Sequence, residues 1–422
     1  MKSISLQKTN DISLIDRVIL YALVFGLMAT SGIPFFIQRK WVLVYFVFCG
    51  LSLLYYYFQV NLQPYLISVL AFSVVLLLQL VYFGISFFIG TVGLQFIIFS
   101  TGLMAAEILK EKFIEFYVNI LVAFAVISLI LFVPILVKFS FSTFLISHFP
   151  ISYQTEIVNP FGGVQYNSSI FFLNFPPNFD IRTRNSGPFW EPGAFGGFLV
   201  LGLMLNVFRG RSPFSKQNLI LMGTIITTFS STAYIALGIF FIGYYGVAIK
   251  SNFGRILFLV AGITGFVVLF GELDFLKKKI VDQIEDTQYQ VDTRGGDSRF
   301  ASAYLDIKEF GERTFYFFAG RGAHPDTRIG TLDKNTIRTN GVTDQLVRWG
   351  IPFFIFYLLS IRKSFAKICG FYSVEEKHSW LALLVLILLA TSEVYFQSSF
   401  FWLLFFLHIP LQRMSAERIY HN

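Results

Sequence analysis

The chain of 422 residues is 55% hydrophobic and only 14% charged, whereas roughly a quarter of the residues of an average soluble domain are charged. This composition excludes an ordinary soluble enzyme and predicts an integral membrane protein, with the lipid bilayer as a partner. The net charge of +8 indicates orientation in a membrane and not nucleic-acid binding, because the basic residues are spread over short loops.

No metal or cofactor site is predicted. Cys49 lies in an apolar stretch and Cys369 in a basic loop, so we expect neither a disulfide nor a cysteine-based metal site. The five histidines are scattered without metal-ligand spacing. The chain has no Walker loop and no dinucleotide fingerprint.

Apolar stretches long enough to cross a bilayer, about 20 residues each, recur along the whole chain. They predict an all-α polytopic membrane protein with about twelve transmembrane helices. The predicted spans are 18–37, 41–58, 65–83, 85–106, 113–137, 189–208, 218–231, 233–249, 254–272, 346–361, 379–394 and 396–411. Two pairs of these spans come from long apolar stretches that polar residues interrupt, at 227–232 and between 392 and 399.

The spans divide the chain into five parts. These are N-terminal transmembrane helices (1–137), a first long loop (138–188), central transmembrane helices (189–272), a second long loop (273–345), and C-terminal transmembrane helices with a tail (346–422). With a cytoplasmic N-terminus, nearly every short basic loop falls on the cytoplasmic side, as the positive-inside rule requires; the exception is Arg39-Lys40. Both termini are then cytoplasmic, and both long loops lie on the outer face.

The second long loop is too rich in apolar periodicity to be a linker. The range 273–284 has the pattern of an amphipathic helix in the headgroup layer. A glycine-rich turn then ends in Arg299, and a further helix follows over 300–310. One face of that helix is predicted to be apolar: Phe300, Tyr304, Ile307 and Phe310. The first long loop offers aromatic rings and amides to sugars at 161–167, but a capping loop over the helix bundle is the preferred interpretation for most of it.

The stretch from Arg182 to Gly197 carries the strongest candidate site. Arg184 and Glu191 place a cation and an anion at a helix start, where Pro192 suits the first helical position and unpaired N–H groups attract anions. An arginine fork suits a phosphate, and Glu191 is placed to accept a proton or to orient a hydroxyl. The alternative is a salt bridge that only fixes the loop to the helix.

Other polar residues are weaker candidates. Arg299 and Arg321 are interpreted as a second phosphate clamp, or else as part of a solvated loop. His324 is a candidate general base, although a lone loop histidine is more often simply exposed. Arg338 near a span has snorkelling to headgroups as its simpler explanation. Glu393 lies in an apolar region, which favours a functional or helix-pairing role with an unknown partner.

The pattern R-x-x-G-x-F-x-E-P, formed by Arg184, Gly187, Phe189, Glu191 and Pro192, resembles the signature of bacterial O-antigen polymerases and their relatives, the O-antigen ligases. Further similarities follow in the same order as in that family. They are the serine-centred break at 228–232, the loop arginine Arg299, the Gly320-x-Gly322 turn, and Asn340 placed ten residues before Gly350.

The resemblance implies a large multi-span glycosyltransferase in the bacterial inner membrane, acting on its outer face upon undecaprenyl-diphosphate-linked oligosaccharide. It implies a metal-independent reaction without a nucleotide sugar, and a chain-length regulator protein as a partner. Thr339 stands where the ligases have a histidine, which favours a polymerase of O-antigen or a related polysaccharide unless His324 replaces that base. The alternatives are a ligase that transfers glycan to lipid A-core, and a flippase for the same lipid-linked units. The flippase is disfavoured by the scarcity of cations within the spans.

On this basis the predicted catalytic residues are Glu191, Arg184 and Arg299. The predicted substrate-binding residues are Arg182, Arg321, Arg338 and Asn340.

Overall fold

The computed structural model describes residues 13–56, 63–84, 89–138, 140–148, 152–158, 164–175, 184–272, 299–324, 327 and 339–420. The N-terminal helices are α1 (Leu14–Gly32), α2 (Arg39–Tyr55), α3 (Leu66–Phe83, after the short 3₁₀ turn Gln63–Tyr65), α4 (Ile89–Leu109), α5 (Lys112–Val137) and α6 (Ser140–His148). The central helices are α8 (Pro192–Phe208), α9 (Lys216–Thr227), α10 (Ser231–Ala248) and α11 (Asn252–Glu272). The C-terminal helices are α13 (Arg299–Glu312), α14 (Thr314–Ala319), α15 (Gly341–Trp349), α16 (Ile351–Phe371), α17 (His378–Ala390), α18 (Ser399–Phe406) and α19 (His408–Tyr420).

The predicted class, a helical membrane protein, is confirmed by the length and composition of these helices. Within the described residues, four helices are long and apolar enough to cross a membrane: Leu14–Gly32, Gln63–Phe83, Gly90–Leu109 and Lys112–Val137. Shorter apolar helices are Pro192–Phe208, Ser231–Val247, Asn252–Gly265 and His378–Ala390. The count of about twelve spans stays a prediction.

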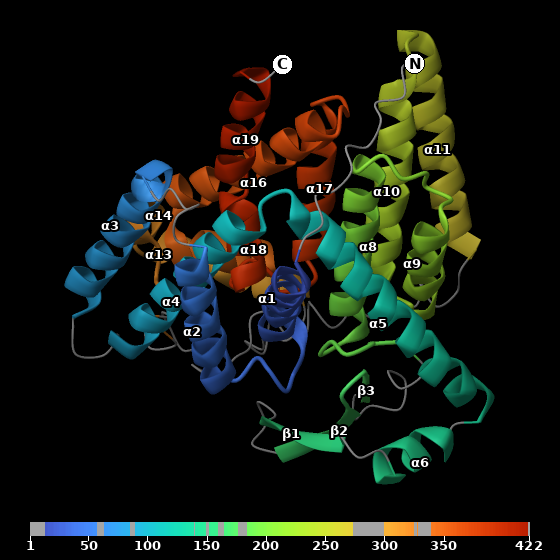
Figure 1. Cartoon of the computed structure of the whole chain (residues 1–422), viewed down its shortest axis with the longest axis horizontal. Helices are drawn as coiled ribbons and strands as arrows, with labels where there is room; N and C mark the ends of the chain where they lie inside the picture. Colours follow the sequence, from blue (N-terminus) through green and yellow to red (C-terminus); the bar gives the residue numbers. More distant parts are fainter. Residues whose placement is uncertain are drawn as a thin grey trace.

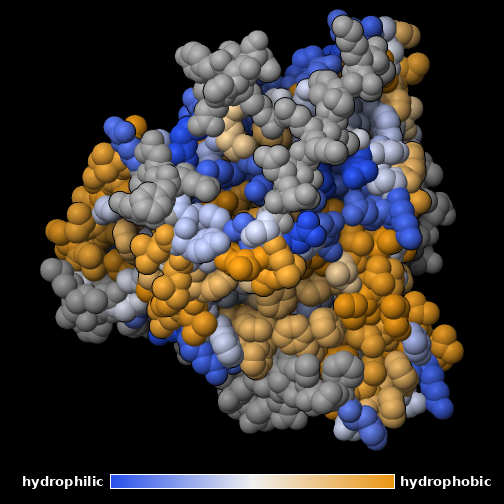
Figure 2. All heavy atoms as spheres, viewed as in Figure 1, coloured by the Kyte–Doolittle hydropathy of each residue, from blue (hydrophilic) through white to orange (hydrophobic). Residues whose placement is uncertain are grey.

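The outer surface has the character of a lipid-facing one. Helix α3 exposes a row of aliphatic side chains, including Ile67, Leu77 and Val81, and such a continuous apolar patch is unusual on a soluble monomer. Figure 2 shows broad hydrophobic areas over α2, α3 and α5, with hydrophilic residues gathered elsewhere on the same face.

The first long loop contains a small antiparallel sheet that the sequence did not predict. Its strands are β1 (Ser152–Val158), β2 (Val164–Ile170) and β3 (Leu173–Phe175), in the order β1-β2-β3. Residue 152 pairs with 170, and residue 168 pairs with 175. The sheet and α6 lie together at one end of the molecule, away from α16 and α19 (Figure 1).

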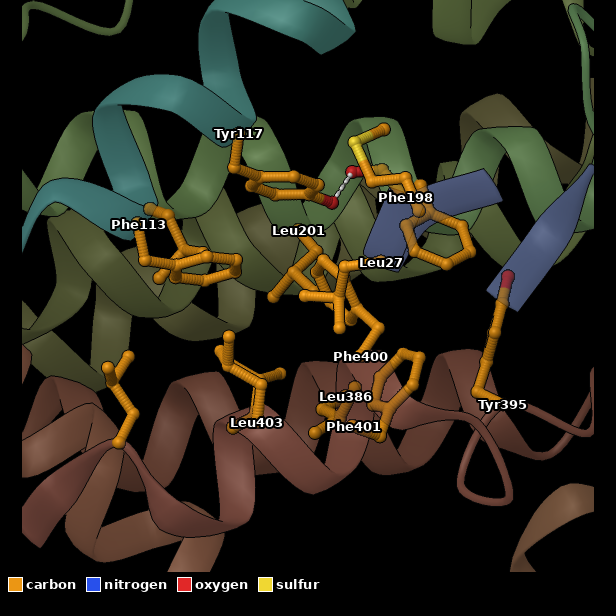
Figure 3. Close-up of a cluster of buried hydrophobic side chains, with 14 of the residues drawn as sticks. Leu27, Phe113, Tyr117, Phe198, Leu201, Leu386, Tyr395, Phe400, Phe401 and Leu403 are labelled. Atoms are coloured by element: carbon orange, nitrogen blue, oxygen red, sulfur yellow. Dashed lines mark hydrogen bonds between the residues drawn. The ribbon is translucent and has the colours of Figure 1, made fainter. Parts of the chain in front are cut away.

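The core is built around α8 and α18, in which every residue is buried. The Tyr117 hydroxyl of α5 donates to the carbonyl of Phe198 at 2.8 Å, and Phe400 packs against both rings (Figure 3). Helix α8 uses a face of small residues, Gly193, Gly196 and Gly197, for close packing. A Cβ at Gly196 would lie only 2.8 Å from the Cβ of Ala233 on α10, and one at Gly197 would collide with Tyr395.

Both predicted interruptions are present as turns between helices. The first separates α9 from α10, where Phe229 has a φ of 46°. The second is the segment 391–398 between α17 and α18. The predicted spans 346–361 and 396–411 differ from the observed helices. Gly350 (φ 78°) divides the first between α15 and α16, and Leu407 separates α18 from α19 within the second.

The predicted helix after Arg299 is α13, and of its predicted apolar face only Phe310 is buried. Phe300, Tyr304 and Ile307 are more than half exposed, whereas Asp306 and Glu309 are buried. The reason is that the buried side of α13 combines Ala301, Leu305 and Phe310 with the carboxylates of Asp306 and Glu309, which lie beside Arg321. The amphipathic helix predicted at 273–284 lies outside the described residues.

Candidate active site

The segment from Arg184 to Glu191 is fixed to the turn between α9 and α10. The backbone N–H of Asn185 donates to the carbonyl of Thr227 at 2.9 Å, and the Asn185 amide donates to the Thr227 hydroxyl at 3.0 Å. The Oδ1 of Asn185 accepts from the N–H of Gly187 at 2.9 Å. Gly187 has a φ of 48°, and a Cβ there would press into the ring of Phe195, so both conformation and space require glycine.

Arg184 is tied to the same turn. Its Nε donates to the carbonyl of Thr228 at 3.1 Å. Burial lowers the pKa of Arg184, and the nearby Glu191 carboxylate opposes that effect. A guanidinium remains charged despite such a shift, so the segment holds a fixed cation whose remaining N–H groups can serve a ligand.

Arg299, the first residue of α13, joins two carboxylates from distant parts of the chain. Its Nη2 lies 3.3 Å from Oε1 of Glu393 and 3.6 Å from Oε1 of Glu191. Its Nε donates to the carbonyl of Ser392 at 2.9 Å. Arg184 interacts electrostatically with Glu191, Arg299 and Glu393, so the three residues predicted as catalytic lie near one another. Together with Glu393 they form what we call the charged cluster.

Glu393 is the buried member of the charged cluster. It is 4% exposed, and its Oε2 accepts from the indole N–H of Trp190 at 3.2 Å. Burial and the adjacent Glu191 carboxylate raise the pKa of Glu393 well above its usual range. Glu191, whose side chain is 39% exposed, is the more accessible carboxylate.

Two glycines make room for Glu393. A Cβ at Gly193 would overlap its Oε1, and a Cβ at Gly341 would overlap its backbone carbonyl. The N-termini of α8 and α15 therefore both meet at Glu393. Because unpaired N–H groups give a helix N-terminus a partial positive charge, the start of α8, which no side chain caps, adds to the attraction of Arg184 and Arg299 for an anion.

Sequence reasoning identified Glu393 as a polar residue in an apolar region but not its partner. That partner, Arg299, is 94 positions away in the chain. The signal was present, because an ionisable residue among apolar helices is a functional candidate by default.

Arg321 is placed differently from its prediction as a phosphate ligand. Its side chain is 1% exposed and lies 2.7 Å from Asp344, 3.6 Å from Glu309 and 3.8 Å from Asp306. Asp344 also pairs with Arg348 at 2.9 Å. In these surroundings Arg321 joins α13 to α15.

Asn340 is the N-cap of α15. Its Oδ1 accepts from the N–H groups of Val342 and Thr343, at 3.1 Å each, which satisfies two otherwise unpaired donors. Asn340 thus has a structural task directly before Gly341, the residue that meets Glu393. The other two predicted ligands, Arg182 and Arg338, lie outside the described residues.

The charged cluster offers two cations and two carboxylates of unequal exposure. Such a group can hold an anion and accept a proton from a hydroxyl. In the described part of the chain, no group of three or more histidine, cysteine or acidic residues is arranged to hold a metal ion.

No protein-family model matches the sequence, and no curated protein sequence matches it. The resemblance to O-antigen polymerases and ligases therefore stays a prediction that the comparisons do not test.

Proposed function

We propose that the chain is a polysaccharide polymerase of the bacterial inner membrane. It joins undecaprenyl-diphosphate-linked oligosaccharide units into O-antigen or a related surface polysaccharide, by transfer of the growing glycan to the terminal sugar of a new lipid-linked unit. The reaction takes place on the outer face, with both termini in the cytoplasm. The observation that carries the proposal is Arg299 between Glu191 and Glu393, with Arg184 close by.

In the proposed reaction, a hydroxyl oxygen of the acceptor sugar attacks the anomeric carbon of the donor glycan. The bond from that carbon to the diphosphate oxygen breaks, and the lipid diphosphate leaves with the electron pair. The acceptor proton passes to a carboxylate, for which Glu191 is the more exposed candidate. Arg184 and Arg299 stabilise the charge that develops on the leaving diphosphate.

A nucleotide sugar and a metal are not needed in this scheme. The lipid diphosphate is a good leaving group, so the reaction mainly requires fixed cations that stabilise the negative charge developing on it. Arginine meets that requirement because its planar fork binds phosphate oxygens in pairs.

Glycan transfer to lipid A-core by a ligase remains the alternative within the same chemistry. It is disfavoured because Thr339 stands at the position of the expected histidine and donates its N–H to Ser302 at 3.0 Å. His324 also lines a pocket in which none of the four charged-cluster residues takes part.

The deciding experiment uses purified protein in lipid vesicles with undecaprenyl-diphosphate-linked repeat units and a metal chelator. A ladder of longer lipid-linked glycans is the expected result. Transfer to added lipid A-core without a ladder would replace the polymerase by the ligase. If neither product forms and the units only cross the bilayer, the protein is a flippase.

A further inference from the structure

Helix α13 carries a row of exposed apolar side chains that its own contacts do not explain. Phe300, Tyr304 and Ile307 are 59%, 52% and 52% exposed. Their spacing of four and then three residues places them on one face of the helix. The buried side of α13 packs against α15, where the Thr343 hydroxyl donates to Asp306 at 2.8 Å. The exposed row therefore faces away from the rest of the protein.

The row continues onto α14. Ile307 and Phe310 are three residues apart and so are neighbours on the surface of α13. The rings of Phe310 and Phe317 lie 4.5 Å apart, measured between their centroids. Phe317 and Phe318 on α14 are 37% and 65% exposed. We call the exposed residues the α13–α14 face: Phe300, Tyr304, Ile307, Phe317 and Phe318.

The α13–α14 face is continuous with the lipid-facing surface of α3. The ring of Phe315 on α14 stacks on the ring of Tyr82 on α3, with centroids 3.8 Å apart. Phe318 is three residues after Phe315 and so lies beside it on α14. On α3, Tyr82 and Val81 are 46% and 78% exposed, and this helix belongs to a candidate membrane span. Lipid that covers α3 therefore reaches the α13–α14 face.

Both ends of α13 are joined to the ends of apolar helices. At its start, Arg299 contacts Glu191, the N-cap of α8. Beyond its end, Phe315 of α14 packs on Tyr82 and Phe83, the last residues of α3. The 14 residues of α13 cover about 21 Å. A helix held in this way lies along the boundary of the bilayer and does not cross it.

The charges at the border of the face suit lipid headgroups. Lys308 follows Ile307 and is exposed, as is Arg313, the N-cap of α14. An apolar face with cations at its border is the pattern of a helix in the membrane interface, where the cations meet anionic headgroups. Tyrosine, here Tyr304, is enriched at the same depth.

We propose that the α13–α14 face docks onto membrane lipids, in the leaflet that the charged cluster faces, with Phe300, Tyr304 and Ile307 among the acyl chains. This inference goes beyond the proposed reaction and does not depend on it. Phe300 directly follows Arg299, so insertion of its ring holds the guanidinium at the level of the headgroup phosphates. The charged cluster then meets a lipid-borne anion without lifting that anion out of the membrane.

The test measures depth with nitroxide labels on single cysteines, in the full chain in nanodiscs that hold one copy each. Tyr304→Cys and Ile307→Cys report on the face, and Glu312→Cys, at an exposed charged position in the last turn of α13, is the matched control. Oxygen concentrates among the acyl chains, whereas a nickel chelate stays in water. We expect the ratio of collision rates, oxygen to chelate, to be on the order of tenfold higher at 304 and 307 than at 312.

A ratio at 304 and 307 as low as that at 312 overturns the proposal. So does a high ratio that appears only when several copies share a vesicle, because the face is then an interface between chains. Neither result depends on whether the protein forms polymer, so the docking and the polymerase fail separately.

A second measurement keeps an aromatic ring on the face. Tyr304→Trp adds one indole at the proposed depth, and lipids brominated in the acyl chains should quench the added fluorescence. The natural protein in the same lipids supplies the background of its own tryptophans. Added fluorescence that brominated lipids leave unchanged places the ring outside the membrane and rejects the docking.

Discussion

At the scale of single residues, the charged cluster depends on one guanidinium between two carboxylates. Arg299 opposes the rise in the pKa of Glu393 that burial and the neighbouring Glu191 cause. The arginine also offers N–H groups to a ligand. Its removal should change chemistry more than folding, because its side chain is still 26% exposed.

Replacement of Arg299 by alanine should lower the rate of glycan transfer by on the order of 100-fold or more, the usual effect of removing one charge-stabilising group. Arg299→Lys should recover only part of the rate, because an ammonium cannot bridge two carboxylates as a fork does. Initial rates of ladder formation give the comparison. The control is Arg209→Ala, which breaks an ion pair with Glu115 away from the charged cluster. A normal rate for Arg299→Ala would exclude Arg299 from the mechanism.

Stability should depend on pH through Glu393. Because its folded-state pKa is raised, the folded protein keeps this proton to a higher pH than the unfolded chain does. The group therefore favours folding at pH values below its ordinary pKa, and this contribution is lost as the pH rises through the raised pKa. Thermal unfolding followed by tryptophan fluorescence should show a fall in Tm with rising pH that is smaller in Glu393→Gln. An identical pH profile for both proteins would contradict the assignment.

At the scale of elements, α15 is held at both ends. Asn340 caps its first turn, and Arg348 in its last turn pairs with Asp344 and thereby with Arg321. The helix is short, so these end contacts decide whether it forms at all.

Asn340→Ala should destabilise the protein by roughly 1 kcal/mol, the usual effect of losing an N-cap. Asn340→Ser should restore both stability and transfer, because a hydroxyl also caps a helix. If serine restores the stability but not the activity, Asn340 contacts the substrate as the sequence predicted.

Arg321→Met should be far more damaging to folding. It leaves the buried carboxylates of Asp306, Glu309 and Asp344 with one cation fewer, and breaking such a buried network costs about 3–5 kcal/mol. The expected result is loss of monodisperse protein on size-exclusion chromatography. A well-folded variant that lacks only activity would return Arg321 to the substrate-binding residues.

Elements with local signals were predictable from the sequence. Pro192 at the start of α8 and the break before α10 follow from residues within one turn of each feature. The face that α13 buries was not predictable, because it depends on Arg321, which meets α13 only in the folded chain. The sheet of β1 to β3 was not predicted, because the aromatic and polar residues of the first long loop were interpreted as a capping loop over the helix bundle.

At the scale of the whole molecule, the proposal requires the sheet and the charged cluster to face the outside of the cell. The short basic segments after α4 and α8, and the basic second half of α16 with Arg362, Lys363 and Lys367, would then face the cytoplasm, as expected for membrane insertion. Both natural cysteines are buried, which leaves the surface free for introduced thiols.

Orientation can be tested with two single substitutions at exposed positions, Ser147→Cys on α6 and Lys216→Cys at the start of α9. An impermeant maleimide added to intact spheroplasts should label the first and label the second only after lysis. The natural protein controls for reaction of Cys49 and Cys369. The opposite pattern would invert the topology and place the charged cluster in the cytoplasm.

The two glycines beside Glu393 have a consequence for how this protein would respond to random mutation. Gly193 and Gly341 carry no chemical group, yet any side chain there displaces Glu393 or its backbone. A selection for surface polysaccharide would therefore find these positions as intolerant as the arginines and glutamates. An observer who ranked positions by intolerance alone would assign catalysis to residues that contribute only empty space.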